Sequence, residues 1–142
     1  MKQEDKQLLL KDLCARQMYN VKCQVFNDVN PYTLSGILHN KPHGQLYFEE
    51  LDWKEYDGFV NVEYCKPYLF PLSSMTEEQK KEYCRWKHEI PVCHYEYGDV
   101  VEEIELFDSP ESFEYLIENH FDVFGLIPLG LAIDATGLNI IY

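Results

Sequence analysis

The sequence predicts an α+β protein: a single domain with an antiparallel sheet of about four to six strands and about three helices on one side. Apolar residues recur at helical spacing near the start of the chain and again over residues 110–120. Between these regions, short segments alternate apolar and polar residues, as half-buried strands do. The length of 142 residues is the usual size of one domain, so residues 1–142 are assigned to a single unit.

The first expected element is a helix over residues 3–16. Apolar side chains recur there about one helical turn apart and form a stripe that should face the core: Leu9, Leu10, Leu13 and Cys14. The opposite side is expected to face solvent, and it carries the polar residues Lys6, Lys11 and Asp12.

Strands are expected next, because short segments with period-two alternation are separated by turn residues. These segments are residues 19–27, 32–38, 45–51 and 59–65. Their spacing predicts an antiparallel meander. The two prolines of residues 66–72 then predict an extended strap that lies outside regular structure.

A second helix is expected to follow Thr76, because Thr76 and Gln79 have the spacing of a capping box. Its core-facing residues should be Tyr83, Trp86 and Ile90. Pro91 should end this helix, because proline cannot continue the hydrogen-bond ladder.

Residues 92–97 and 100–107 are predicted to be strands from their β-branched and aromatic content, although the second of these segments also fits a helix face. A third helix is predicted over residues 110–120, where the apolar residues and His120 share one sector. His120 is expected to be a hydrogen-bonded core histidine rather than a functional group.

The remaining residues are expected to add one short helix and two strands. Asp122 is placed to cap a helix that ends at Gly130. The apolar residues 131–133 and 138–141 are read as strands.

Charge is unevenly distributed along the chain. The net charge is -13, yet no Lys or Arg follows Lys87, and residues 91–142 hold eleven Asp and Glu residues. This balance excludes nucleic-acid binding through a basic surface. A one-signed surface would instead attract a basic protein, and the expected interaction face consists of Glu103, Glu105, Glu111, Glu114 and Glu118. The competing interpretation is an ordinary solvated face.

Two functions follow from these observations. The first is a non-catalytic acidic interaction protein that contacts a basic protein surface, as an inhibitor or as an imitation of DNA. The alternative is a module that binds a small ligand or nucleotide in an aromatic pocket formed by Tyr68, Phe70, Tyr83 and Trp86. Neither function involves direct contact with nucleic acid or a membrane.

No catalytic or cofactor-binding pattern is found. Zinc accepts the ligand types of Cys84, His88, Cys93 and His94, but the paired spacing of structural zinc sites is missing, so no metal site is predicted. The chain has neither a nucleophile elbow nor a glycine-rich phosphate loop. A cysteine–histidine dyad stays open as an enzymatic alternative, since five residues of each type are present, but no motif supports it. No cofactor is expected.

The sequence favours a cytoplasmic protein. Acidic residues occupy the beginning of the chain, where an export signal needs basic and then apolar residues. The longest weakly charged stretch, residues 123–142, is interrupted by proline and glycines, so a membrane-spanning helix is not expected. The five cysteines are irregularly spaced and are expected to be reduced thiols.

Three segments carry a resemblance to a known family. They are Asp12-Leu13-Cys14-Ala15-Arg16, the proline-bracketed residues 66–78, and the residues around His120-Phe121-Asp122 and Gly125 to Ala132. Together they resemble a family of small uncharacterised proteins from gut Bacteroides-type genomes, their phages and mobile elements. The resemblance implies an intracellular setting and a phage or prophage origin, and it transfers no catalytic residue.

Overall fold

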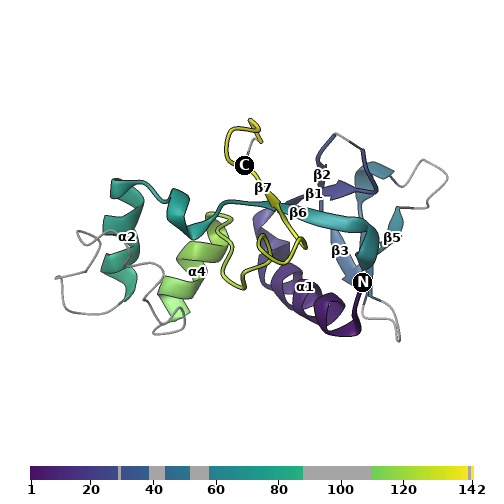
Figure 1. Ribbon diagram of the computed structural model, residues 1–142, viewed down its shortest axis with the longest axis horizontal. Helices are drawn as coiled ribbons and strands as arrows, with labels where there is room; N and C mark the ends of the chain where they lie inside the picture. The colour runs from purple at the N-terminus through teal and green to yellow at the C-terminus, as the bar shows by residue number, and fades with distance from the viewer. Residues whose placement is uncertain (29, 39–43, 52–57, 88–109, 141) are drawn as a thin grey trace.

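The computed structural model describes residues 1–28, 30–38, 44–51, 58–87, 110–140 and 142, with the backbone alone for residues 84–87 and 110. Within these ranges the chain forms three α-helices and two β-sheets, which confirms the predicted α+β fold (Figure 1). The strands predicted over residues 92–107 lie outside the described residues.

The larger sheet has the strand order β2-β1-β6-β7. Its strands are β1 (Lys22–Val25), β2 (Tyr32–Thr33), β6 (Cys65–Leu69) and β7 (Ile133–Asp134). Strand β1 is antiparallel to both β2 and β6, whereas β7 is parallel to β6. The smaller sheet is an antiparallel meander of β3 (Gly36–Leu38), β4 (Gln45–Tyr47) and β5 (Phe59–Asn61).

The prediction of one continuous meander is therefore wrong, because the chain changes sheets between two adjacent residues. Leu34 donates its backbone N–H to Val21 beside β1, and Ser35 donates its own to Tyr47 of β4. The predicted strand over residues 32–38 is thus divided into β2 and β3. The segments at 45–51 and 59–65 are shortened by 3-10 turns at Glu49–Leu51 and Val62–Tyr64.

The expectation that prolines keep residues 66–72 out of regular structure is also wrong, since β6 contains Pro67. The backbone N–H of Phe26 donates to Tyr64, so alternation along the antiparallel pair places the next hydrogen-bonded pair at Gln24 and Lys66. Pro67, opposite Cys23, then falls at a position whose nitrogen points away from β1. The missing N–H costs no hydrogen bond to that strand.

Helix α1 (Gln3–Arg16) has the predicted bounds but buries a different face. Leu9 and Leu13 are fully buried, as predicted, but Cys14 is exposed. Asp12, which is expected in solvent, is fully buried together with Arg16. The buried face of α1 keeps the 3.6-residue period but includes these two charged residues. Their burial is tolerated because they form an ion pair with each other.

Two hydrophobic cores are joined by β6. The first lies between α1 and the sheets and includes Leu9, Cys23, Leu46 and Leu69. The second lies around α2 (Glu77–Lys87) and α4 (Pro110–Glu118) and includes Tyr83, Leu116, Ile117 and Phe121. The chain of β6 runs from the sheets toward α2, so Leu69 packs in the first core and Phe70 against the second (Figure 1).

The predicted helix over residues 122–129 is wrong, because this segment forms consecutive turns. The Asp122 carboxylate accepts the backbone N–H groups of Leu126 and Ile127 at 2.8 and 2.9 Å. In a helix capped by Asp122, these two amides would instead donate to the backbone carbonyls of residues 122 and 123. Of the expected strand over residues 131–133, only Ile133 lies in a strand, the two-residue β7 that it forms with Asp134, and residues 138–140 form no strand.

The predicted capping box before α2 is confirmed. Gln79 donates its backbone N–H to the Thr76 hydroxyl at 3.2 Å, and Thr76 donates its own to the Gln79 side-chain oxygen at 2.8 Å. Each side chain satisfies an amide that the helix start leaves unpaired.

We predict that Thr76→Ala lowers the free energy of unfolding by about 1 kcal/mol, because it removes the side-chain acceptor at the helix start. Thr76→Ser keeps the hydroxyl and should cost much less. Urea unfolding of both variants measures the difference. Equal losses in the two variants would show that the hydroxyl does not stabilise α2.

Candidate functional site

Three of the predicted interaction residues lie together on α4. Glu111, Glu114 and Glu118 are exposed and follow one another at three- and four-residue spacing, opposite the buried Leu116 and Ile117. We call these three glutamates the acidic face. With Tyr115 they line a surface hollow of about 220 Å³.

The acidic face has no basic counterpart within the part of the chain that the structure describes. The ion pairs there join Lys6 to Glu63, Arg16 to Asp12 and Lys80 to Glu77. The glutamates therefore repel one another along α4, and Glu118 also lies at the negative end of the helix dipole. A nearby cation from another molecule would relieve both effects.

Two tyrosines, both missed by the sequence analysis, are positioned at this surface by hydrogen bonds to glutamates. Tyr19 donates its hydroxyl to Glu114 at 2.8 Å, and this bond raises the pKa of Tyr19. Tyr115 donates to Glu82 of α2 at 3.2 Å, and burial together with Glu82 raises the pKa of Tyr115 to about 12. Both hydroxyls therefore remain protonated donors at neutral pH.

Several predicted residues lie outside the described side chains. These are Glu103 and Glu105 of the expected interaction face, Trp86 of the aromatic pocket, and the candidate ligands Cys84, His88, Cys93 and His94. Among the residues whose side chains are described, no group of three or more His, Cys, Asp or Glu is arranged to hold a metal ion.

The other three residues of the aromatic-pocket hypothesis are mostly buried. Tyr83 is fully buried and its ring centroid lies 6.3 Å from that of Tyr115. Phe70 packs against the same core, with its ring 6.4 Å from that of Phe121. Tyr68 is 5 % exposed. None of the three lines the hollow beside α4.

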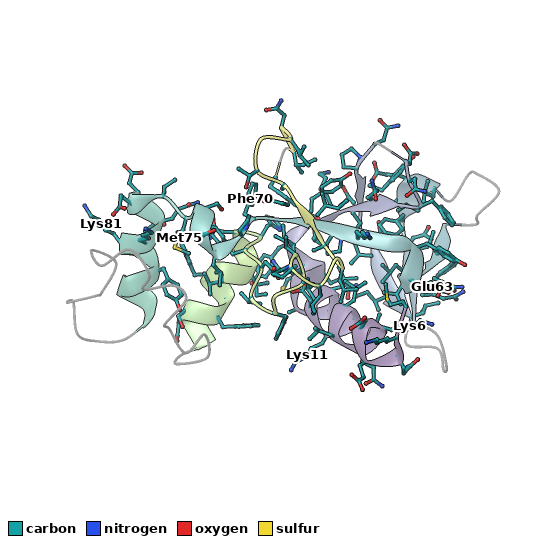
Figure 2. All side chains as sticks on the ribbon, in the orientation of Figure 1. Lys6, Lys11, Glu63, Phe70, Met75 and Lys81 are labelled. Carbon is teal, nitrogen blue, oxygen red and sulfur yellow. The ribbon has the colours of Figure 1, made fainter. Side chains whose placement is uncertain are left out.

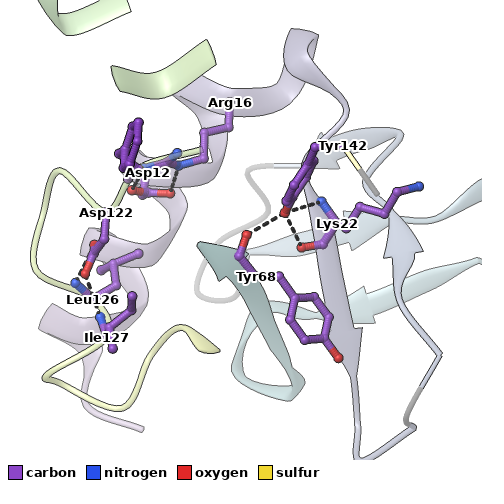
Figure 3. A network of polar contacts seen from close by, with 9 residues as sticks. Asp12, Arg16, Lys22, Tyr68, Asp122, Leu126, Ile127 and Tyr142 are labelled. Atoms are coloured by element: carbon purple, nitrogen blue, oxygen red, sulfur yellow. Dashed lines mark hydrogen bonds and ion pairs between the residues drawn. The ribbon is translucent and has the colours of Figure 1, made fainter. Parts of the chain in front are cut away.

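A buried polar cluster was not predicted from the sequence. The Arg16 guanidinium contacts both carboxylate oxygens of Asp12, at 2.6 and 3.1 Å (Figure 3). It also donates to the backbone carbonyl of Phe121. Burial raises the pKa of the Asp12 carboxyl, and Arg16 opposes that rise. The four-residue spacing of Asp12 and Arg16 is the one sequence signal that could have revealed the pair.

His120 is buried, as predicted, but it is not fully hydrogen-bonded. Its Nδ1 atom has no partner among the described residues. Its backbone has a φ of +63°, and its ring stacks on Tyr142 with centroids 3.5 Å apart. Burial, followed by the nearby Arg16, lowers the pKa of His120 to about 4.

Comparisons of the chain with family models, curated proteins and solved structures find no match. Within the described residues, no helix has both the length and the apolar character needed to cross a membrane. Function is therefore inferred from the charge and geometry of this chain alone.

We predict that His120 makes the protein acid-sensitive. Because its folded pKa of about 4 lies below its usual value of 6.5, the unfolded chain binds more protons between these values. Stability should therefore fall by roughly 2–3 kcal/mol as the pH drops from 6.5 to 4. Asparagine tolerates positive φ and does not titrate, so His120→Asn should lose this component. Urea unfolding at several pH values measures how the free energy of unfolding depends on pH. The same dependence in both proteins would contradict the prediction.

Proposed function

We propose that the protein is a non-catalytic interaction protein whose acidic face binds a basic surface of another protein. The observation that carries this proposal is the set of three exposed glutamates, unpaired with any described Lys or Arg, lining one hollow with Tyr115. An ordinary solvent-exposed helix could carry the same three glutamates. The shared hollow and the adjacent tyrosine favour a binding surface over that interpretation.

The chemistry of the hollow suits Lys or Arg side chains. Its carboxylates can accept charge-assisted hydrogen bonds from either side chain. Two lysines of α1 are directed elsewhere. Lys6 lies beside Glu63 (Figure 2), and the Lys11 ammonium lies 5.2 Å from the ring centroid of Phe124. The negative potential of α4 would thus be available to a partner.

Such a protein would act by occupying a basic surface, as an inhibitor or as an imitation of DNA. The net charge of -13 supports fast, salt-dependent association with a basic partner. A cytoplasmic setting and a phage or mobile-element origin belong to this proposal. The first is supported by the sequence pattern and the resemblance, and the second by the resemblance alone.

Neutralising the acidic face should weaken binding more than the same charge change elsewhere. The test variant is Glu111→Gln, Glu114→Gln and Glu118→Gln combined. The matched control changes three exposed glutamates on other elements, Glu4, Glu49 and Glu78, to Gln. The probe is a short peptide of alternating Arg and Gly, titrated by calorimetry at low salt.

We expect about tenfold weaker binding for the face variant and less than twofold for the control, because the three glutamates of the face line one hollow whereas the control glutamates lie on three different elements. Equal loss in both variants would show that net charge alone attracts the peptide. No loss in either variant would also contradict the proposal.

A further inference from the structure

Another surface hollow, of about 330 Å³, lies on the outer face of the larger sheet. Val25 and Cys65 pair and face the core, so the neighbouring pair, Gln24 and Lys66, directs its side chains to the opposite face. The hollow opens on that face, next to the turn that follows β1. Among the described residues it is lined by Gln24, Phe26, Asn27, Glu63, Tyr64 and Lys66. We call this space the sheet hollow.

Two exposed aromatic rings form one wall of the sheet hollow. Phe26 and Tyr64 are 40 % and 48 % exposed, and their rings stack with centroids 5.2 Å apart. A third ring cannot enter between them, because each stacking contact needs about 3.5 Å between carbon atoms. A planar ligand would therefore lie on the exposed side of this pair, where it would cover apolar surface and stack on the rings.

Phe26 occupies a backbone position that favours glycine. Its φ is +56°, in the left-handed region that is unfavourable for a bulky side chain. It is the second residue of a turn that is closed by the Asp28 N–H donating to the Val25 carbonyl at 3.1 Å. Because the ring stays exposed, burial does not fully offset this strain. Strained backbone of this kind is concentrated at functional sites, so Phe26 points to a role beyond packing.

The charged groups of the sheet hollow leave it locally positive. Glu63 is paired with Lys6 of α1 at 3.7 Å (Figure 2). Lys66 is exposed, and its ammonium has neither an ion pair nor a hydrogen bond with the residues that the structure describes. This local charge is opposite in sign to the net charge of -13. An anionic group is therefore the complementary partner of Lys66.

Two amide side chains add directional hydrogen-bonding groups. Gln24 is the cross-strand partner of Lys66, and Asn27 follows Phe26 in the turn. Within the described ranges, neither amide side chain has a hydrogen-bond partner. An amide both donates and accepts, which is the combination that recognises the edge of a nucleobase. The rings, the amides and the ammonium together suit a planar base joined to an anionic group.

We infer that the sheet hollow binds a nucleoside monophosphate, with the base on the Phe26–Tyr64 pair and the phosphate at Lys66. Its volume falls within the range of small-ligand sites, about 300–1,000 Å³. The sheet hollow uses none of the four residues of the aromatic pocket expected from the sequence. It also shares no residue with the acidic face, so this inference does not depend on the proposed interaction function.

Calorimetric titration of the unaltered chain compares ligands that carry both chemical groups with ligands that carry one. AMP, GMP, CMP and UMP each carry a base and a phosphate, whereas the four nucleosides lack the phosphate and inorganic phosphate lacks the base. The nucleotide that binds most tightly should exceed its own nucleoside and inorganic phosphate by at least about tenfold in affinity. Failure of all four nucleotides to bind at millimolar concentration, or equal binding of the nucleoside, would overturn the proposal.

Two variants test the aromatic wall. Phe26→Gly removes the ring and suits the positive φ, so nucleotide binding should weaken at least about tenfold while the urea midpoint of unfolding does not fall. Phe59→Ala is the matched control, because it removes another ring that is 40 % exposed and packs on Tyr47 outside the sheet hollow. It should change nucleotide binding less than twofold. Equal effects of the two substitutions on binding would contradict the proposal, and a lower urea midpoint in Phe26→Gly would show that the ring is retained for packing.

A second pair of variants tests the anion contact. Lys66→Gln should weaken binding of the nucleotide about tenfold and leave binding of its nucleoside unchanged, because only the phosphate needs the ammonium. Lys2→Gln, which removes an exposed lysine outside the sheet hollow, should change neither. Equal losses for nucleotide and nucleoside in Lys66→Gln, or equal losses in the two variants, would overturn the assignment. If Phe26→Gly does not fold, this comparison decides.

Discussion

A single buried guanidinium, that of Arg16, joins the first helix to the segment that follows α4. Its side chain is fully buried, where an unpaired charge would be very unfavourable. Asp12, one turn earlier on the same helix, neutralises it, and the carbonyl of Phe121 accepts a further hydrogen bond. Removing either charge would leave the other buried without compensation, which costs far more than the pair itself contributes.

The position of the acidic face depends on this contact through a short series of bonds. Phe70 donates its backbone N–H to His120, and Asp122 donates its own to Phe70, so residues 120–122 pair with the end of β6. Because α4 ends at Glu118, only two residues before this pairing, fixing Phe121 also fixes the direction in which α4 leaves the sheet. Asp122 then braces the following turns through the amides of Leu126 and Ile127.

Local features could be predicted from the sequence, whereas long-range pairing could not. The helix over residues 3–16 and the capping box of Thr76 depend on residues within one or two turns, and both are confirmed. The neighbours of β6 come from the two ends of the chain, and period-two alternation carries no information about which strands pair. The burial of Asp12 was missed because charged residues are normally exposed, so an apolar stripe omits them.

The same distinction between local features and long-range contacts holds for the candidate sites. The common side of Glu111, Glu114 and Glu118 follows from helical spacing alone, but Tyr19 reaches Glu114 across 95 residues of sequence. Phe26 likewise meets Tyr64 only through the pairing of β1 with β6, which no local pattern reveals.

Native-state hydrogen exchange of Arg16→Met tests most directly whether Arg16 holds the α4 segment against the sheet. Lys11→Met, which removes an exposed charge from the same helix, is the comparison. The backbone N–H groups of Phe70 and Asp122 should lose protection in Arg16→Met while those of β4 retain it, because the first core does not include the 120–122 pairing. Unchanged protection at Phe70 and Asp122, or an equal loss across both cores, would contradict this role of the buried guanidinium.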